Sequence, residues 1–394
     1  MQITKAVAAG SLMLMASLAP GAGAQSISQR VASVRDGKVK MTFAARPDLC
    51  GWGNGISTSS DFDRGTTRSW SSDKNEDIEF DDACSRGPGR LVITMRSGRI
   101  ERIRAYVGGR WRPDASARDL GQVSTRELTD YLFGVASSGS GKAAREAIFP
   151  ATIADSVNVI QPLYDLARNE ARDKEVREQA VFWLSQQPED RAVGLLENIL
   201  NTARSQDIRD KAIFGLSQHR SGKGFPILRA YAEDNRQPED LRGKAIFWLG
   251  QRKGAERFDY LRGLYTRLES EDLKDKVIFA MSQQKDDASM KWLVDLALNS
   301  REPMDMRKKA LFWAGQSSGN IANLTSMYDR MAERDLKEHM VFVLSQRREQ
   351  AAMDKLMSIA RNDPDRELRR KAMFWLGQSR DPRVSAFLAE IIAR

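Results

Sequence analysis

The sequence predicts a mainly α-helical protein, in which a right-handed α-α superhelix of about eight helix pairs follows a small disulfide-bonded β-rich module. Three observations lead to this prediction. A twelve-residue segment with helical periodicity recurs seven times between Glu175 and Gln378. The chain before Trp111 instead alternates polar and apolar residues between turn clusters, and it contains both cysteines of the 394-residue chain. We therefore expect three segments, which are residues 1–24, 25–113 and 114–394.

Residues 1–24 have the pattern of a secretory signal peptide. Lys5 supplies a short positive region, residues 6–18 form an apolar run, and Ala22-Gly23-Ala24 fits the small-residue cleavage rule. The alternative is a buried N-terminal helix. The apolar run is shorter than the roughly 20 residues that a membrane helix needs. We expect an exported protein, periplasmic or secreted, that does not span a membrane and begins near Gln25.

The segment 25–113 is expected to form a small antiparallel β module. Val39, Met41 and Phe43 alternate with polar residues along one expected strand. The apolar runs 91–95 and 100–107 flank a short turn of the kind found in β-hairpins. A unit of this size has a limited core, so a covalent link would stabilise it.

Cys50 and Cys84 are expected to supply that link as a structural disulfide, because an oxidising compartment favours pairing of the two thiols. The alternative is a catalytic thiol, but this part of the sequence contains no histidine to activate one. Between the cysteines, six acidic residues from Asp73 to Asp82 are expected to lie in a solvated loop. A calcium loop is the alternative, although the spacing does not match the EF-hand pattern.

The rest of the chain is dominated by the repeated segment. Its copies share an acidic first residue, a central Phe and a terminal Gln, and the central phenylalanines recur every 30 to 33 residues. An eighth, divergent copy begins near Gly141. Periodicity of this length is typical of solenoids. The seven regular copies are residues 175–186, 207–218, 240–251, 272–283, 305–316, 335–346 and 367–378.

Each repeat is expected to be a pair of helices. In the first copy Val176, Ala180 and Leu184 share one helical face, and Phe182 extends the apolar surface around the helix. A second amphipathic segment follows each copy and differs in sequence from repeat to repeat. Because such a pair cannot bury its apolar surface alone, neighbouring pairs must stack, and we expect the repeated phenylalanines in the core.

The pattern acid-φ-Arg/Lys-x-x-Ala-φ-Phe-x-φ-Gly/Ser-Gln, where φ is apolar, resembles HEAT repeats, and most of all the short HEAT-like version with its acid-φ-Arg opening. The resemblance covers well over half of the chain. It implies an α-solenoid and a protein partner, because HEAT arrays mostly act as protein-binding scaffolds. Together with the signal-like N-terminus, it indicates an exported bacterial member of this group.

A longer period is superimposed on the repeat, because the residue after each Phe alternates between large and small. We expect a pair of repeats to be the building block, with bulky side chains against small ones and opposite charges paired between neighbouring copies. Core packing is the favoured interpretation of the tryptophans, and an aromatic row that stacks a ligand is the alternative. The alternating residues are Trp183, Gly215, Trp248, Ala280, Trp313, Val343 and Trp375.

Two polar columns accompany each Phe. The terminal glutamines, such as Gln186, are expected to bond free carbonyls at the helix ends or to form an amide ladder. A polar ligand-binding row is the alternative. The residue three positions before each Phe is usually Lys, as at Lys211, and is expected on a solvated flank, with a basic stripe as the alternative.

Composition argues against several classes of function. The formal charge is +9, but residues 114–394 carry 45 basic and 42 acidic side chains, which makes nucleic-acid binding by the solenoid unlikely. The only two histidines, His219 and His339, lie in different repeats, so no convergent site is visible. We expect no catalytic residues, no metal ligands and no cofactor, and we expect that the protein is not an enzyme.

We therefore expect a protein-binding adaptor of the cell envelope. The second segments, which vary between repeats, are expected to form the inner surface that binds a protein partner. Their aromatic residues Tyr260, Tyr265, Trp292 and Tyr328 are the candidate contacts, with half-buried packing as the alternative. The leading alternative function is a regulatory or accessory subunit of an envelope enzyme, followed by a cryptic enzyme.

Overall fold

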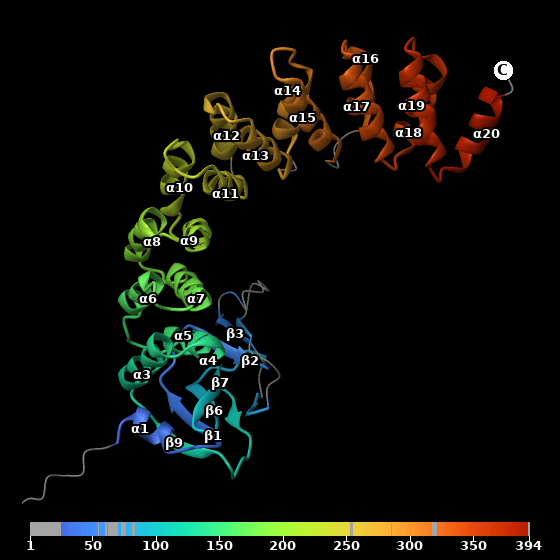
Figure 1. The fold of residues 1–394 in the computed structure, drawn as a ribbon. Helices are drawn as coiled ribbons and strands as arrows, with labels where there is room; N and C mark the ends of the chain where they lie inside the picture. The colour runs from blue at the N-terminus through green and yellow to red at the C-terminus, as the bar shows by residue number, and fades with distance from the viewer. Residues whose placement is uncertain are drawn as a thin grey trace, which may run out of the picture. The chain divides into compact units, whose positions relative to one another are not determined.

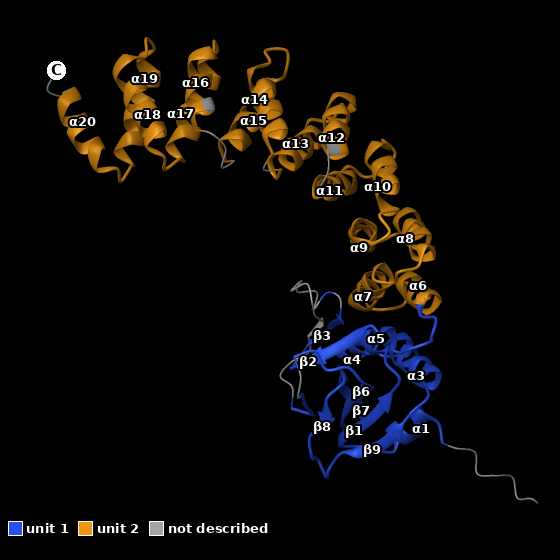
Figure 2. Cartoon of the chain, turned by 180° about the vertical axis from the view of Figure 1, so that it is seen from behind, with its two compact units in different colours: residues 1–159 blue, residues 160–394 orange. Residues whose placement is uncertain are grey.

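The chain divides into two compact units, Met1–Val159 and Ile160–Arg394 (Figure 2). The predicted signal peptide, residues 1–24, lies outside the described residues, as do Asp73, Asp81 and Asp82 of the predicted acidic loop. The computed structural model describes residues 25–53, 55–59, 61, 70–71, 76–80, 83–252, 255–284, 286–316 and 321–392.

The first unit is built around a four-stranded sheet with the strand order β7-β6-β1-β9. Strand β6 pairs antiparallel with β1 and β7, and β9 runs parallel to β1. Val39, Met41 and Phe43 are all buried, as their alternation predicts, because one face of β1 packs into the core. The strands are β1 (Gly37–Phe43), β6 (Gly89–Arg96), β7 (Arg99–Val107) and β9 (Arg118–Gln122).

The predicted hairpin joins β6 to β7 through Ser97 and Gly98. Both residues have positive φ angles, 51° and 72°, which is the geometry that a two-residue hairpin turn with the correct twist requires. The amide of Ser97 donates to Asp36 Oδ1 at 2.8 Å, which ties the turn to the segment before β1. The prediction of a hairpin at this position is confirmed.

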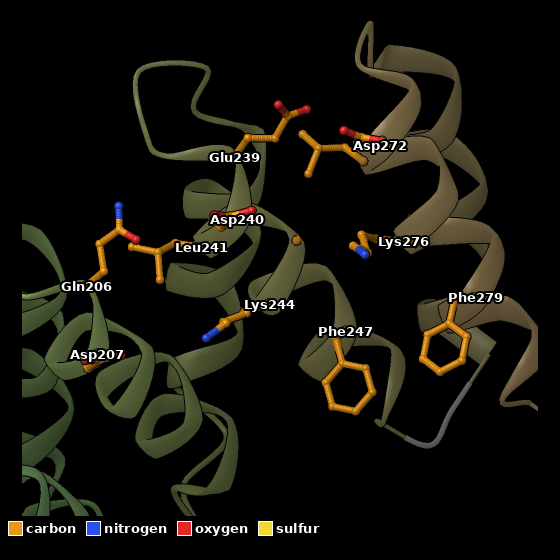
Figure 3. A pocket seen from close by; sticks show the side chains of 12 residues that line it. Gln206, Asp207, Glu239, Asp240, Leu241, Lys244, Phe247, Asp272, Lys276 and Phe279 are labelled. Atoms are coloured by element: carbon orange, nitrogen blue, oxygen red, sulfur yellow. The ribbon is translucent and has the colours of Figure 1, made fainter.

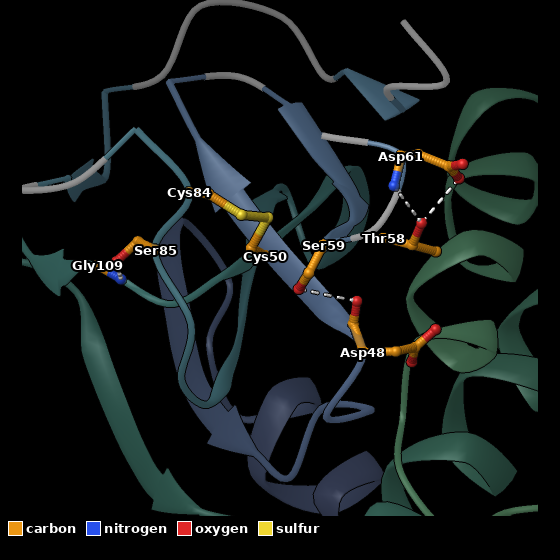
Figure 4. The surroundings of a disulfide bond; sticks show 8 residues. All are labelled: Asp48, Cys50, Thr58, Ser59, Asp61, Cys84, Ser85 and Gly109. Atoms are coloured by element: carbon orange, nitrogen blue, oxygen red, sulfur yellow. Dashed lines mark hydrogen bonds between the residues drawn. A yellow bond between two sulfur atoms is a disulfide. The ribbon is translucent and has the colours of Figure 1, made fainter. Parts of the chain in front are cut away.

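Two smaller sheets surround the disulfide. Cys50 on β2 is bonded to Cys84, with the Cα atoms 5.2 Å apart, so the predicted pairing is confirmed (Figure 4). Next to it, the backbones of Gly51 and Ser85 exchange two hydrogen bonds of 2.9 and 2.8 Å. One sheet contains β2 (Leu49–Trp52), β3 (Gly55–Thr58) and β4 (Trp70–Ser71), and the other contains β5 (Ile78–Glu79) and β8 (Arg110–Trp111).

One acidic residue of the expected solvated loop is buried instead. Asp77 accepts hydrogen bonds from Lys38 Nζ at 2.7 Å and from the Tyr106 hydroxyl at 3.0 Å, and Arg104 lies 3.4 Å away. Burial raises the pKa of Tyr106, which keeps the hydroxyl protonated as a donor. The prediction was wrong for Asp77 because its charge is matched by residues from two other strands, which the local sequence does not reveal.

Helices complete the first unit. The amide of Ile103 on β7 donates to Glu146 Oε2 at 2.8 Å, and Ala144 and Ile148 are buried where α4 and α5 cover that strand. The unit therefore continues beyond residue 113, and the divergent repeat copy that begins near Gly141 belongs to it. The helices are α1 (Ile27–Ala32), α3 (Thr125–Ser138), α4 (Gly141–Glu146) and α5 (Ile148–Thr152).

The second unit consists of helices in two layers, as the repeats predict (Figure 1). We call the helices that carry the repeated segment the motif helices: α7 (Lys174–Ser185), α9 (Gln206–Gln218), α11 (Glu239–Gly250), α13 (Glu271–Ser282), α15 (Met304–Gln316), α17 (Arg334–Ser345) and α19 (Arg366–Gly377). The others are the variable helices: α6 (Ile160–Arg168), α8 (Asp190–Thr202), α10 (Gly224–Glu233), α12 (Ala255–Arg267), α14 (Asp287–Leu298), α16 (Ile321–Arg330), α18 (Gln350–Asn362) and α20 (Pro382–Ile392).

Helices of the second unit pack in a definite order. Most motif helices pack more extensively on the variable helix before them than on the one after them, as α15 does on α14 and α19 does on α18. Most structural pairs thus begin with the variable helix. Successive motif helices also pack closely on one another, whereas successive variable helices touch less. The continuous layer of the unit is therefore formed by the motif helices.

An arginine near the start of several motif helices links the two helices of a pair. Arg177, Arg242 and Arg307 are buried, and their Nε atoms donate to carbonyls of the preceding variable helix at 2.9 to 3.0 Å. These carbonyls lie in the last turn of a helix, where no intrahelical donor remains and where the dipole favours a cation. The guanidinium thus caps one helix from the start of the next.

Replacing Arg242 by Met is expected to destabilise the second unit by about 2 kcal/mol, because the Ala232 carbonyl loses a charge-assisted hydrogen bond. The measurement is the guanidinium unfolding midpoint, with hydrogen exchange to locate the loss in α10 and α11. Arg262→Met removes an exposed arginine of α12 and is the control, with an expected change within about 0.5 kcal/mol. Equal effects of the two variants would contradict the capping role.

Reducing the disulfide is expected to lower the unfolding free energy of the first unit by roughly 3–4 kcal/mol. The bond joins residues 34 positions apart, and breaking it raises the conformational entropy of the unfolded chain. Denaturant unfolding of the oxidised and reduced chain measures the change. A Cys50→Ala/Cys84→Ala variant should show the lower midpoint with or without reductant. Identical midpoints for the oxidised and reduced wild type would show that the bond does not stabilise the fold.

Candidate functional site

The four candidate contacts on the variable helices do not form one exposed surface. Tyr265 and Tyr328 are buried, and their hydroxyls donate to Glu302 at 2.9 Å and to Asp363 at 2.6 Å. Glu302 lies just before α15, and Asp363 lies just before α19. Each tyrosine therefore links its own helix pair to the next pair. They are not exposed contacts as expected, because each side chain is buried and its hydroxyl is bonded to a carboxylate 35 or more residues away in the sequence.

The other two candidates are half-buried. Trp292 packs edge to face on Tyr265, with ring centroids 5.3 Å apart. Tyr260 lies beneath the Arg229 guanidinium, which is 4.6 Å from the ring centroid. The structure therefore brings Tyr265 and Trp292 together as packing residues and leaves Tyr260 and Tyr328 apart from them. Contact of Tyr260 or Trp292 with a partner stays a prediction.

The repeated phenylalanines lie on the face of the motif helices that points away from the core. Six of them are half-buried, and Phe374 is 58% exposed. In α11 the core is instead filled by Leu241, Ala245 and Leu249. At about 100° per residue, Phe247 lies roughly opposite the centre of that apolar stripe. The expectation that the phenylalanines form the core was wrong, and this angle is the signal in the sequence that identifies them as surface residues.

Together with the tryptophans, these phenylalanines form a row of aromatic side chains across the motif helices. Trp248 packs on Phe247 of its own helix and on Phe214 of the preceding motif helix, at centroid distances of 5.1 Å for both pairs, and Trp313 and Trp375 pack in the same way. Phe247 and Phe279 are stacked at 6.2 Å. We call this set the aromatic row: Phe182, Trp183, Phe214, Phe247, Trp248, Phe279, Phe312, Trp313, Phe342, Phe374 and Trp375.

Two kinds of interface alternate along the motif helices. A Cβ atom at Gly250 would lie 2.6 Å from the Ala280 Cβ, and one at Gly315 would lie 2.1 Å from Val343 Cγ1. The C-terminal ends of α11 and α13, and of α15 and α17, are thus in close contact through small residues. At the interfaces between these, the Trp of one helix packs on the Phe of the previous one. Small residues therefore meet small ones and Trp meets Phe, which corrects the expected pairing of bulky with small.

The lysine column is held by ion pairs between motif helices. Lys244 Nζ lies 2.6 Å from Asp210 of the preceding motif helix, and Lys309 lies 3.5 Å from Asp275. Lys211 pairs with Glu178 and Lys371 with Glu338 in the same way. The predicted pairing of opposite charges between copies is confirmed at these four steps, so the column is not a free basic stripe.

The glutamine column forms local bonds. The side-chain amide of Gln186 donates to the Ser185 hydroxyl at 3.1 Å, and that hydroxyl donates to the Phe182 carbonyl at 2.7 Å. The same arrangement recurs at Gln218, Gln283 and Gln346. In these four repeats the glutamine completes its own helix end, and no amide ladder connects the copies.

A groove of about 640 Å³ lies along α11 and α13 and reaches α9 (Figure 3). Its groups are arranged in order. The carboxylates of Glu239 and Asp272 lie toward one end, Lys276 lies in the middle, and the rings of Phe247 and Phe279 lie at the other end. The groove thus combines part of the aromatic row with charged groups of both signs.

A second groove of about 310 Å³ is lined by residues of α13, α15 and α17, among them Phe312, Trp313 and His339. Burial and the charge of Lys308 lower the pKa of His339, so its ring is neutral at pH 7. Each groove lies beside two motif helices that lack the ion pair that a lysine of the column forms between the others. At these places Gly243 of α11 and Lys308 of α15 stand where the other helices carry an acidic residue.

The described residues contain neither a candidate metal cluster nor a candidate membrane helix. In the part of the chain that the structure describes, no cluster of three or more His, Cys, Asp or Glu side chains has the geometry for a metal ion. Within the same residues, no helix combines the length and the apolar character that a membrane crossing requires. Aromatic faces, matched charges and two grooves are features that bind another molecule by contact.

Comparison with known proteins shows partial likeness to solved structures. Human deoxyhypusine hydroxylase is 16% identical over 59% of this chain and 88% of its own, with a TM-score of 0.28. YibA of Escherichia coli is 15% identical over 65% and 96%, with a TM-score of 0.33, and importin beta is 11% identical over 64% and 40%, with 0.35. No family model and no curated protein matches the chain. At these scores the likeness carries no argument about function, and the assignment of an α-solenoid rests on the stacked helix pairs themselves.

The close interfaces predict opposite effects for one substitution at two equivalent positions. Gly250→Ala is expected to destabilise the chain by about 1–3 kcal/mol, because the new methyl group would overlap the Ala280 side chain. Gly377→Ala, at the same place in α19 with open space around it, is expected to stabilise by about 0.5–1 kcal/mol through helix propensity. Chemical denaturation measures both, and stabilisation by Gly250→Ala would contradict the close contact.

Proposed function

We propose that this protein is an exported scaffold that binds another protein along the aromatic row of its motif helices. One observation carries the proposal. The Phe is repeated in all seven copies, although it lies opposite the core and the fold buries Ala, Ile and Leu in its place. Aromatic side chains, Phe included, are enriched at protein interfaces relative to the rest of the protein surface.

The length of the row favours a polypeptide over a small molecule. Neighbouring helices pack roughly 8–10 Å apart, so seven motif helices present a row on the order of 50–60 Å long. A small ligand would fill one groove and leave most of the aromatic side chains exposed. The binding surface that we propose is therefore the motif-helix layer, in place of the variable helices that the sequence pointed to.

Two features support export. Residues 1–24 have the composition of a signal peptide, and the only two cysteines are joined in a disulfide, as is usual outside the cytoplasm. Fractionation of cells that produce the full chain, with mass determination of the mature N-terminus, tests this part of the proposal. Recovery of an uncleaved chain in the cytoplasm would contradict it.

Replacing Phe214, Phe247 and Phe279 together by Ser is expected to reduce capture of the partner from envelope extract at least tenfold. The side chains are half-exposed, so the helical circular dichroism spectrum should be retained. The measurement is affinity capture with the mature, oxidised chain at low and high salt, followed by mass spectrometry, with the bound protein then re-bound in purified form.

A double variant of the variable helices, Tyr260→Ser/Trp292→Ser, is the matched control, because it removes half-buried aromatic side chains from the other layer. It should leave capture unchanged. If the control abolishes capture and the triple variant does not, the binding surface lies on the variable helices and the proposal is wrong.

A further inference from the structure

One lysine of the ion-paired column lacks the carboxylate that its equivalents bind. The residue that precedes it in the column, on α11, is Gly243, and Lys276 forms no ion pair within the described part of the chain. Lys276 lines the 640 Å³ groove. Its ammonium group is therefore an unmatched charge on the proposed binding surface.

The other interrupted step is different. There Lys308 replaces the acidic residue, and its Nζ lies 3.9 Å from Asp335, so this lysine has a carboxylate of its own. The residue of the lysine column at this step is His339. Its pKa is lowered, so its ring does not add a second positive charge beside Lys308. Lys276 is thus the position where the groove presents a cation without a counter-charge.

Gly243 leaves room beside Lys276. A Cβ atom at Gly243 would lie 3.3 Å from Lys276 Cγ, so the lysine stem passes directly over the missing side chain. Helices α11 and α13 are in contact near their C-terminal ends through Gly250 and Ala280, and the groove runs along them from Glu239 to Phe247 and from Asp272 to Phe279. Gly243 and Lys276 both line the groove, so a ligand carboxylate can approach the lysine from the groove at the step where α11 supplies none.

The groups along α13 follow one another in a single direction along the groove. Asp272, Lys276 and Phe279 are four and three residues apart, which spreads them over about 10.5 Å along the helix axis. Three alternate side chains of an extended strand span about 13 Å. The difference is small enough for long, flexible side chains to take up, so an extended segment can place one side chain each at the acidic end, the lysine and the phenylalanine pair (Figure 3).

We propose that this groove binds an extended segment of the protein partner in which a basic, an acidic and an apolar side chain occupy alternate positions; this inference rests on the proposed function. The carboxylate binds Lys276 in place of the missing aspartate. The basic side chain meets Glu239 and Asp272, and the apolar side chain packs on Phe247 and Phe279.

The test uses a displayed library of random twelve-residue peptides selected on the mature, oxidised full chain. The expected result is enrichment of peptides with the pattern basic-x-acidic-x-apolar in one chain direction or the other. Synthetic peptides of the enriched sequence are then titrated by fluorescence anisotropy. A change of the acidic residue to Lys should weaken binding to the wild type at least tenfold and should be rescued by Lys276→Glu.

Gly243→Asp is the decisive variant, because it supplies from within the chain the carboxylate that Lys244 and Lys309 receive from Asp210 and Asp275. The substituted chain should fold, since Asp has a better helix propensity than Gly and the flexible Lys276 stem needs to move by only a few tenths of an ångström to admit the new Cβ. Peptide affinity should fall at least tenfold. Gly194→Asp, at an open helical glycine of α8, makes the same chemical change away from the groove and should leave affinity unchanged.

The outcomes separate this inference from the proposed function. Peptides that bind Gly243→Asp and wild type equally, yet lose affinity for the Phe214/Phe247/Phe279 triple variant, would overturn the lysine subsite and leave the aromatic row in place. Peptides that are insensitive to the triple variant as well, or a failure to enrich any peptide, would overturn both. Loss of binding on Gly194→Asp equal to that on Gly243→Asp would show a general charge effect and would also overturn the subsite.

Discussion

The contact between small residues at the C-terminal ends of motif helices is the constraint on which the second unit depends. Because Gly250 and Gly315 carry no side chain, the next motif helix can place Ala280 or Val343 directly against the backbone. The intervening interfaces are filled by Trp on Phe and are held by an ion pair. Two repeats, not one, therefore form the structural unit, and the two grooves lie beside the helices that meet through small residues, α11 with α13 and α15 with α17.

This alternation also explains the exposed aromatic side chains. A tryptophan at the wider interface covers one side of two phenylalanines, its own and that of the previous motif helix. The remaining surface of each ring faces away from the Ala, Ile and Leu residues that fill the core. The repeated residues thus serve two different purposes. One set stabilises the stack, and the Phe set forms a surface whose uniformity the core does not require, which is why we assign binding to it.

Charged residues are mostly used within the molecule. Buried arginines such as Arg242 cap the preceding helix, and lysines such as Lys244 pair with the preceding motif helix. This internal use accounts for a solenoid that is rich in charged residues and yet carries nearly equal numbers of each sign. It also gives weight to Lys276, where the internal match is missing at the groove. On the motif-helix layer the other lysines of the column are paired. We therefore expect the aromatic side chains to supply most of the binding energy and Lys276 to supply selectivity.

The sequence by itself determined the features that depend on local periodicity: the helices and their period, the alternation along β1, the hairpin at Ser97, and the pairing of the only two cysteines. Helix propensity, strand alternation and turn geometry act over a few residues, so one stretch of sequence contains the whole signal. Only the tertiary structure decided that Tyr265 and Asp77 are buried. They contact Glu302 and Tyr106, which lie 37 and 29 positions away, and such contacts exist only once the helices and strands are packed.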